Sequence, residues 1–147
     1  MKIYAELTEN IWNRKNCGIK SLQVNKLFHI HFGYPGFNTK DSLTLIKYFD
    51  MYIGVPSVLL DTDKKRRKLY GKAGCFRLTE YGFEYRVLSS AMMKTPDLLR
   101  KVWSGIERSV IEFNNCGRIY DSSTVQEIIN KNNTKLAEQF IKELNIK

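Results

Sequence analysis

Two histidines at two-residue spacing, His29 and His31, and an acid–base pair with the same spacing, Glu84 and Arg86, are the residues best suited to chemistry. A neutral imidazole binds divalent metals, and a protonated one attracts anions. The carboxylate of Glu84 can hold a hard cation, and the guanidinium of Arg86 can neutralise a phosphate or a substrate carboxylate. From these residues alone, a metal or phosphate site and ordinary strand residues both remain open.

Further cations occur near the acid–base pair in the sequence: Arg66, Arg67, Lys72 and Arg77. Gly71 and Gly74 lie among them and would permit close backbone approach to a ligand. Opposite charges on a polar sheet face suit nucleotide phosphates bridged by magnesium. A sheet face held by Glu–Arg pairs and open to water would explain the same spacing, so this alternative also stays open.

The elements that would position these residues are short strands. Residues Leu22 to Gly33 alternate in character, which predicts a half-buried strand with both histidines on one face. Gly74 to Thr79 and Gly82 to Leu88 are two further strand candidates, and the few residues between them predict a hairpin. In the second strand, Glu84 and Arg86 should share one face, opposite the apolar residues Phe83, Tyr85 and Val87.

Helices are predicted on both sides of the hairpin. Thr39 is expected to cap a helix whose apolar stripe, Leu43, Ile46, Phe49 and Ile53, ends at Gly54. Val55 to Leu60 is then a short apolar run broken by Pro56, and the charged stretch Asp61 to Lys68 is expected to form an exposed loop.

Three more helices are expected in the last third of the chain. Thr95-Pro96-Asp97 predicts a helix start: the Thr95 hydroxyl can cap it, Pro96 suits the first helical position, and Asp97 lies near the positive end of the helix dipole. The helix should reach about Asn114. Ser123-x-x-Gln126 offers a capping box. Thr134 could cap a final helix carrying Leu136, Phe140 and Leu144. With strands first and helices last, the fold class is predicted as α+β, in one domain spanning residues 1–147.

The net charge of the chain indicates which classes of partner it could attract. A net charge of +9 and a pI near 9.5 give a positive field that attracts nucleic acid, nucleotides or acidic protein surfaces. The basic run is Lys64, Lys65, Arg66, Arg67 and Lys68; with Tyr70 as a stacking aromatic it could bind nucleic acid. The three cysteines, Cys17, Cys75 and Cys116, predict neither a disulfide framework nor a zinc cluster. No apolar run indicates a membrane span or a signal peptide, so we expect no membrane association and a cytoplasmic location in the host cell.

Four motifs, in conserved order and spacing over roughly residues 27–95, together resemble the phage-type carboxylate-amine ligases, relatives of glutamine synthetase and glutamate-cysteine ligase. They are His29-Ile-His31-Phe-Gly33-Tyr34, Tyr48-Phe-Asp50-Met-Tyr-Ile-Gly54-Val-Pro56-Ser-Val, Arg66-Arg-Lys-Leu-Tyr70-Gly71-Lys72-Ala-Gly74-Cys-Phe-Arg77, and Tyr81-Gly82-Phe-Glu84-Tyr-Arg86. The resemblance implies a ligase-like core over 27–95, with an antiparallel sheet like the C-terminal half of the glutamine-synthetase catalytic fold. A helical C-terminal part would follow over 95–147.

The resemblance also implies site roles. In the superfamily an antiparallel sheet holds ATP and divalent metals, and a phosphorylated carboxylate is attacked by an amine. By motif, His29 and Glu84 would bind magnesium, and His31 would lie near the nucleotide phosphates. The basic contacts to ATP would be Lys72, Arg77, Arg66 and Arg67. Arg86, with Arg77, would face the transferred phosphoryl group or the substrate carboxylate.

The chain departs from the family pattern before the histidines. Leu27-Phe28 replace an expected glycine pair, and Glu6 and Glu9 are the only acids ahead of His29. The family usually carries a long N-terminal portion there, with an acidic strand that supplies further metal ligands. Because phosphoryl transfer depends on metals for positioning and charge neutralisation, we expect a site lacking metal ligands to lose rate before it loses ATP binding.

Three functions follow as hypotheses. The first is a shortened, phage-derived domain reused as a non-catalytic binding or inhibitor protein, docking its basic face on a host protein or nucleoprotein complex such as a defence complex. The second is an ATP- and magnesium-dependent carboxylate-amine ligase completed by a neighbouring subunit in a homo-oligomer. The third is nucleic-acid binding through the basic run, with an affinity that falls steeply with salt.

Overall fold

The structure is a computed structural model that describes residues 28–33, 36, 38–69 and 71–146. The predicted strand residues before Phe28 lie outside this part, as do Glu6, Glu9, Cys17 and Tyr70. Cys75 and Cys116 are both free thiols.

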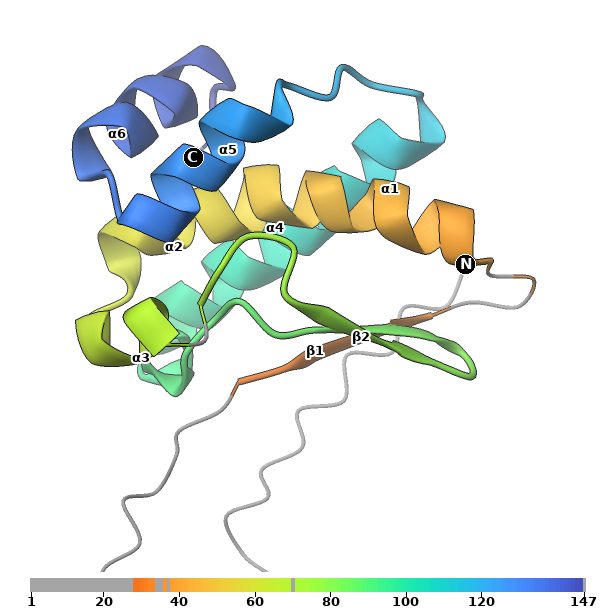
Figure 1. Ribbon diagram of the computed structural model, residues 1–147, viewed down its shortest axis with the longest axis horizontal. Coiled ribbons are helices and arrows are strands. Elements are labelled where there is room, and N and C mark those ends of the chain that lie inside the picture. The colour runs from red at the N-terminus through yellow and green to blue at the C-terminus, as the bar shows by residue number, and fades with distance from the viewer. Residues whose placement is uncertain (1–27, 34–35, 37, 70, 147) are drawn as a thin grey trace, which may run out of the picture.

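The described strands form a small antiparallel sheet. The strands β1 (Ile30–Gly33), β2 (Phe76–Thr79) and β3 (Gly82–Tyr85) lie in the order β1-β3-β2. Figure 1 shows this sheet beneath a layer of helices. The predicted hairpin between β2 and β3 is confirmed, and each strand is shorter than its predicted range.

Two glycines let β1 and β3 approach each other closely at the turn end of the sheet. Gly33 faces Gly82 in the register. A Cβ added to Gly82 would lie 2.0 Å from the Phe32 carbonyl oxygen, and one added to Gly33 would lie 2.0 Å from the Tyr81 carbonyl oxygen. A side chain at either position would therefore push the strands apart.

One long helix, in three parts, crosses the molecule above the sheet. It consists of α1 (Thr39–Phe49), the π-helical turn η1 (Asp50–Gly54) and α2 (Val55–Leu60). The predicted end at Gly54 is therefore wrong. The predicted cap is wrong by one residue, because the Asn38 side chain accepts the Asp41 N–H at 2.9 Å and Thr39 is the first helical residue.

The π-helical turn explains how the helix passes Pro56. Proline has no N–H to donate, and its ring clashes with the carbonyl four residues earlier. In η1 the Val55 N–H donates to the Asp50 carbonyl, five residues back, so the helix is wider just before the proline. The apolar run Val55 to Leu60 thus continues the helix, with Val58 fully buried.

The basic run forms a short helix, α3 (Lys64–Leu69), and not the predicted exposed loop. Only part of the run is exposed, because Arg66 and Arg67 are 8% and 4% exposed, and Asp61 just before it is 1% exposed. Lys64, Lys65 and Lys68 are exposed. Hydrophilic composition was therefore a poor guide to exposure in this stretch.

The remaining elements are η2 (Ser90–Met93), α4 (Pro96–Asn114), α5 (Ser122–Lys131) and α6 (Thr134–Glu143). The start of α4 is confirmed: Thr95 is its cap, accepting the Leu98 N–H at 3.2 Å. The predicted Ser123 capping box is wrong, because the cap position of α5 is Asp121, two residues earlier. Asn133, and not Thr134, caps α6 and accepts the Leu136 N–H at 3.1 Å.

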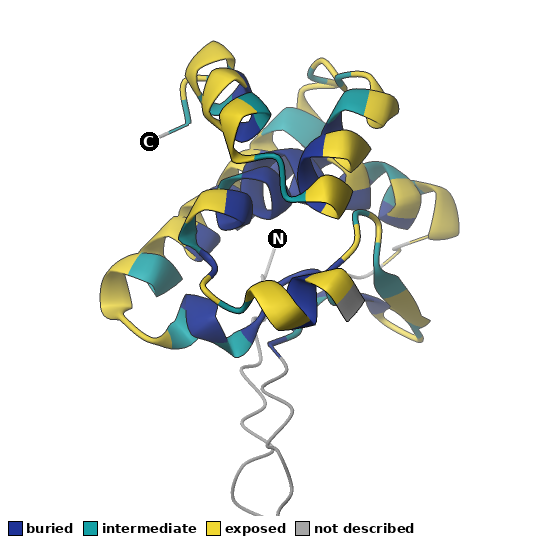
Figure 2. Ribbon diagram, turned by 60° about the vertical axis from the view of Figure 1, so that its left-hand side comes forward, coloured by how far each residue is buried: buried dark blue, intermediate teal, exposed yellow. Residues whose placement is uncertain are grey.

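The core lies between the sheet and the long helix. Phe49 of α1 packs edge-on against Phe32, Phe83 and Tyr85 of the sheet, with ring centroids 5.3–5.7 Å apart. Behind them α4 packs on α1 and η1, and α6 packs on α2. The inward surfaces of both layers are buried (Figure 2). The α+β class is confirmed, although α1, α2 and α3 lie between β1 and β2 in sequence.

The long helix, Thr39–Leu60, is long and apolar enough to cross a membrane by length and composition alone. Within its apolar window, 67% is buried inside the protein. Most of its apolar residues therefore pack in the core of this domain, but Leu43, which was predicted in the apolar stripe, is 45% exposed, and Leu59 is 39% exposed.

Candidate functional site

Five of the residues predicted to carry chemistry lie together on one side of the sheet. In the antiparallel register His31 pairs with Glu84, and Glu84 pairs with Arg77 on the other side. His29 and Arg86 extend the same face by contacting Glu84 directly. We call these five residues, His29, His31, Arg77, Glu84 and Arg86, the polar sheet face. The alternation of apolar and polar residues predicted this side correctly.

Glu84 is the centre of the polar sheet face. Its side chain is 3% exposed, yet it contacts three cationic or ionisable groups. Oε1 contacts His29 Nδ1 and lies 3.6 Å from Arg86 Nε, and Oε2 lies 2.5 Å from Arg77 Nη2. The arginine side chains are far more open, at 64% for Arg77 and 40% for Arg86. A buried acid therefore holds two arginines that still face solvent.

Burial lowers the pKa of His29, although Glu84 opposes this effect; the positive charges of Arg86 and Arg66 reinforce it. His29 is thus neutral at physiological pH. Because a carboxylate can only accept, Nδ1 carries the proton and Nε2 carries the lone pair. Nε2 is buried and has no hydrogen-bond partner among the described residues.

His31 has a different neighbour. Its Nδ1 lies 2.6 Å from the hydroxyl of Tyr81, which comes from the β2–β3 turn and is 52% exposed. A phenol can donate or accept, so this contact fixes the ring without consuming both of its nitrogens. The contact ties the edge strand β1 to the tip of the hairpin.

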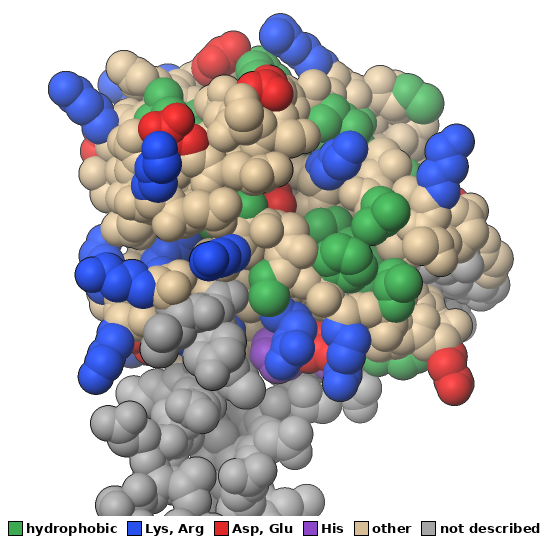
Figure 3. All heavy atoms as spheres, in the orientation of Figure 1, with side chains coloured by type: hydrophobic (Ala, Val, Ile, Leu, Met, Phe, Trp, Pro, Cys, Tyr) green, Lys and Arg blue, Asp and Glu red, His purple; other side chains and the backbone are tan. Residues whose placement is uncertain are grey.

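At the sheet end of the molecule, lysine and arginine side chains flank a histidine and an acidic side chain (Figure 3). Lys72 lies in the loop before β2 and is exposed. That loop is anchored at two points: the Ala73 N–H donates to Asn130 Oδ1 at 2.8 Å, and the Gly74 N–H donates to Asp50 Oδ2 at 2.7 Å. Gly74 has a φ of 67°, which glycine adopts without strain.

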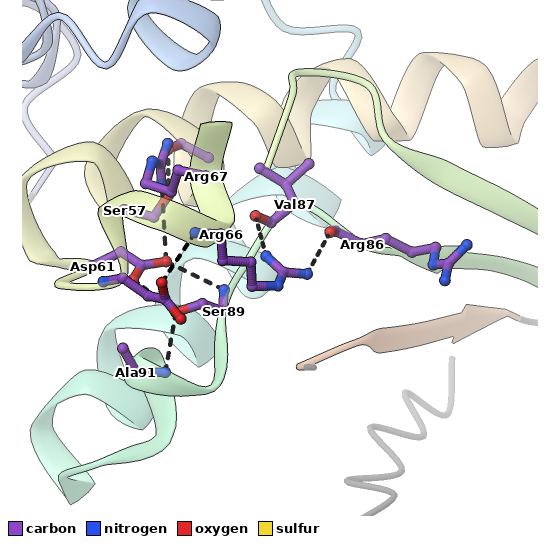
Figure 4. Close-up of polar contacts among 10 residues, drawn as sticks. Ser57, Asp61, Arg66, Arg67, Arg86, Val87, Ser89 and Ala91 are labelled. Atoms are coloured by element: carbon purple, nitrogen blue, oxygen red, sulfur yellow. Dashed lines mark hydrogen bonds and ion pairs between the residues drawn. The ribbon is translucent and has the colours of Figure 1, made fainter. Parts of the chain in front are cut away.

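Arg66 and Arg67 are held inside the protein (Figure 4). Arg66 donates to the Val87 and Arg86 carbonyls, at 3.3 Å each. Arg67 donates to Ser57 Oγ at 2.8 Å, and its Nη1 lies 3.8 Å from Asp61 Oδ2. These contacts fasten α3 to α2 and to the end of β3. The two arginines predicted as phosphate contacts are thus buried and bonded within the protein. The basic run offers nucleic acid three exposed lysines in place of five cations.

A magnesium ion needs several oxygen ligands in octahedral geometry. In the described part of the chain, no group of three His, Cys, Asp or Glu residues is placed to hold a metal ion. Glu84 is the one carboxylate of the polar sheet face, and both its oxygens already contact His29 or Arg77. The described residues alone do not fit the magnesium site predicted from His29 and Glu84. The exposed arginines do fit an anionic group, such as a phosphate or a carboxylate.

Asp50 lies in the second family motif, and no role was predicted for it. It lies in η1 and accepts the Tyr85 hydroxyl and the Gly74 N–H, both at 2.7 Å. Burial raises its pKa to about 7, although both hydrogen bonds oppose the shift. The sequence does mark this position, because Asp50 is a lone acid in the apolar run from Tyr48 to Val58. It joins the long helix to the loop that carries Lys72.

The family model named "Phage phiEco32-like COOH.NH2 ligase-type 2" matches residues 24–111. The chain belongs to this ligase family. The matched range runs from β1 through most of α4, so it contains the polar sheet face and leaves α5 and α6 outside. No curated protein and no solved structure matches the chain. The predicted likeness of the sheet to the glutamine-synthetase catalytic fold thus stays a prediction.

Proposed function

We propose that this ligase-family chain is a non-catalytic binding protein of phage origin, which contacts anionic groups of a host protein or nucleoprotein complex through the polar sheet face. Membership of a phage ligase family supports the origin. The proposed consequence of binding is inhibition, and a host defence complex is the proposed target class.

The observation that carries the proposal is the arrangement around Glu84. Two arginines and a histidine share one buried carboxylate, which leaves an excess of positive charge on the polar sheet face. Arg77 and Arg86 keep much of their surface in solvent and can donate to an incoming carboxylate or phosphate. Because Glu84 fixes both guanidinium groups before a partner arrives, less side-chain entropy is lost on binding.

The arrangement of possible metal ligands supports binding of an anionic partner over catalysis of ATP-dependent ligation. ATP-dependent ligation relies on divalent cations to neutralise the phosphates, and the described donors do not provide their ligands. An anionic partner needs no such metal. The same arginines that would contact ATP in a ligase can therefore contact the acidic groups of a protein or nucleoprotein surface.

The test is a pull-down from the natural host with and without ATP and magnesium. The double variant Arg77→Glu/Arg86→Glu reverses the exposed charges of the polar sheet face. A matched control, Arg100→Glu/Lys135→Glu, makes the same change in total charge on α4 and α6, where both residues are exposed. We expect one partner to be captured by the wild type and the control without nucleotide, and to be lost with the double variant. Equal capture by all three proteins would refute the proposal.

The second candidate is an ATP-dependent carboxylate-amine ligase completed across a homo-oligomer. The observation in its favour is that five family-motif residues, the polar sheet face, lie side by side. If it is correct, the purified protein hydrolyses ATP when a carboxylate and an amine are supplied, and Glu84→Gln abolishes this turnover. An absence of turnover over a broad substrate panel would count against the ligase.

A further inference from the structure

A pocket of about 510 Å³ opens between η1, α2, α4 and α6, and none of its lining residues belongs to the polar sheet face. Small-molecule sites in proteins have volumes of roughly 300–1,000 Å³, with mostly apolar walls and a few polar groups. Leu59, Leu60, Ile141 and Leu144 are among the apolar residues that line it. The pocket is thus separate from the site described above and has the size of a ligand site.

Gly105 of α4 lines the pocket at the point where α4 packs closely on η1. A Cβ at this position would lie 2.6 Å from the Tyr52 carbonyl oxygen and 2.8 Å from Ile53 Cγ1. The absence of a side chain lets α4 cross η1 at close range. Tyr52 of η1 also lines the pocket.

The wall opposite α4 is built by the turn that ends α6. Asn145 has a φ of 50°, and its N–H donates to the Lys142 carbonyl at 3.1 Å. The Ile146 N–H donates to the Ile141 carbonyl at 3.1 Å. This pair of bonds is a Schellman motif, which returns the chain against the last helical turn. Ile146 and Ile141 therefore line the pocket together.

The charged residues that line the pocket are both cations, and both belong to α4. Lys101 and Arg108 lie seven residues apart on α4, which places them two turns apart on the same face. The Arg108 guanidinium lies 5.7 Å from the Tyr52 ring centroid and 2.7 Å from Glu112 Oε1. Within the described residues, no ion pair engages Lys101, and no aspartate or glutamate lines the pocket. An apolar space with cations along one edge complements an anion that carries an apolar body.

We infer that this pocket binds a small amphipathic carboxylate, with its aliphatic tail against Leu59 and Ile146 and its carboxylate at Lys101 and Arg108. The tail replaces water along the apolar walls, so each methylene group that it buries favours binding. The cations select the anion over an alcohol or an amine of the same length. Ser104 and Asn145 supply the further polar lining groups.

The probe is decanoate, titrated into the full chain by isothermal titration calorimetry below its micellar range. Decanol and decyltrimethylammonium are the uncharged and cationic probes of equal tail length. Lys101→Glu reverses the unpaired cation at the edge, and Ser104→Phe places a ring in the opening. Lys135→Glu is the matched control, because Lys135 is exposed on α6 and does not line the pocket. Circular dichroism confirms that each variant is folded.

We expect saturable one-to-one decanoate binding, weakened at least about fivefold by Lys101→Glu and by Ser104→Phe but by less than about twofold by Lys135→Glu. Decanol should bind the wild type and Lys101→Glu equally, and decyltrimethylammonium should bind the wild type more weakly than decanoate does. Equal losses in Lys101→Glu and Lys135→Glu would overturn the inference, because they would indicate attraction to overall charge. Absence of saturable binding would also overturn it, as would self-association lost in Ser104→Phe without decanoate binding, which would assign the pocket to a second copy of the chain.

Discussion

Asp50→Asn should remove the loss of stability that Asp50 causes in the wild type as the pH rises. The folded pKa of Asp50 is about 7 and its ordinary value is 3.8, because burial disfavours the ionised form. A carboxyl group with a raised folded pKa stabilises the fold fully below its unfolded pKa. That contribution is lost as the pH rises through the folded pKa. The stability linked to Asp50 therefore falls between about pH 4 and about pH 7.

The magnitude follows from the difference between the two pKa values. A gap of about 3 pH units, at about 1.36 kcal/mol each, gives about 4 kcal/mol. Asparagine imitates the protonated acid: Nδ2 can donate to the Tyr85 hydroxyl while Oδ1 accepts the Gly74 N–H. We expect Asp50→Asn to cost about 1 kcal/mol at about pH 4 and to be about 3 kcal/mol more stable than the wild type at about pH 8. Burial raises the pKa of Tyr85 well above its ordinary value, so Tyr85 stays neutral over this range.

The assay is urea denaturation of both proteins followed by far-UV circular dichroism at several pH values. Glu138→Gln, at an exposed position of α6, is the control for removing an acid that folding leaves in water. Its stability should stay parallel to that of the wild type. If the curves for Asp50→Asn and the wild type also ran parallel, folding would not hold Asp50 in its protonated form, and the reasoning from burial would be refuted.

Three further predictions concern the fold, each measured as a free energy of unfolding in urea. Asn133→Ala should cost about 1 kcal/mol and Thr134→Ala less than half of that, because the asparagine caps α6; equal costs would contradict this assignment. Gly82→Ala should cost at least about 3 kcal/mol, since its Cβ would lie 2.0 Å from a β1 carbonyl oxygen, and a neutral effect would mean that the strands can separate freely. Arg67→Ala should cost about 3 kcal/mol, because it leaves Asp61 buried without its cation, and a stable variant would show that hydrogen bonds alone satisfy that acid.

The polar sheet face was predictable because strand periodicity is local. Alternation alone placed His29 with His31 and Glu84 with Arg86 on shared faces, and the register then aligned the two pairs. The contacts within the face were not predictable. Spacing cannot show that Glu84 is 3% exposed or that both its oxygens contact neighbouring side chains. Its role as a metal ligand stays a prediction.

The predictions of the helix caps, of the basic run and of the end of the long helix were wrong for other reasons. Asn38 and Asn133 each precede a threonine, and either residue of such a pair can cap a helix, so the sequence fixes the start only to within one residue. Burial of Arg66 and Arg67 depends on acceptors distant in the chain, Val87 among them, which no window around the basic run contains. The continuation of the helix past Pro56 depends on the π-helical turn, which allows the proline to be accommodated.

The extra residue in that turn also sets the rotational phase of everything after it. Each helical residue turns the chain by about 100°, so inserting one changes the direction in which all later side chains point. The α1 part therefore presents its apolar stripe to α4 and the sheet, while α2 presents a rotated stripe to α6. Deleting one residue between Asp50 and Gly54 would leave the helix almost as long, yet would turn the α2 stripe away from α6 and separate the C-terminal helices from the ligase-like core.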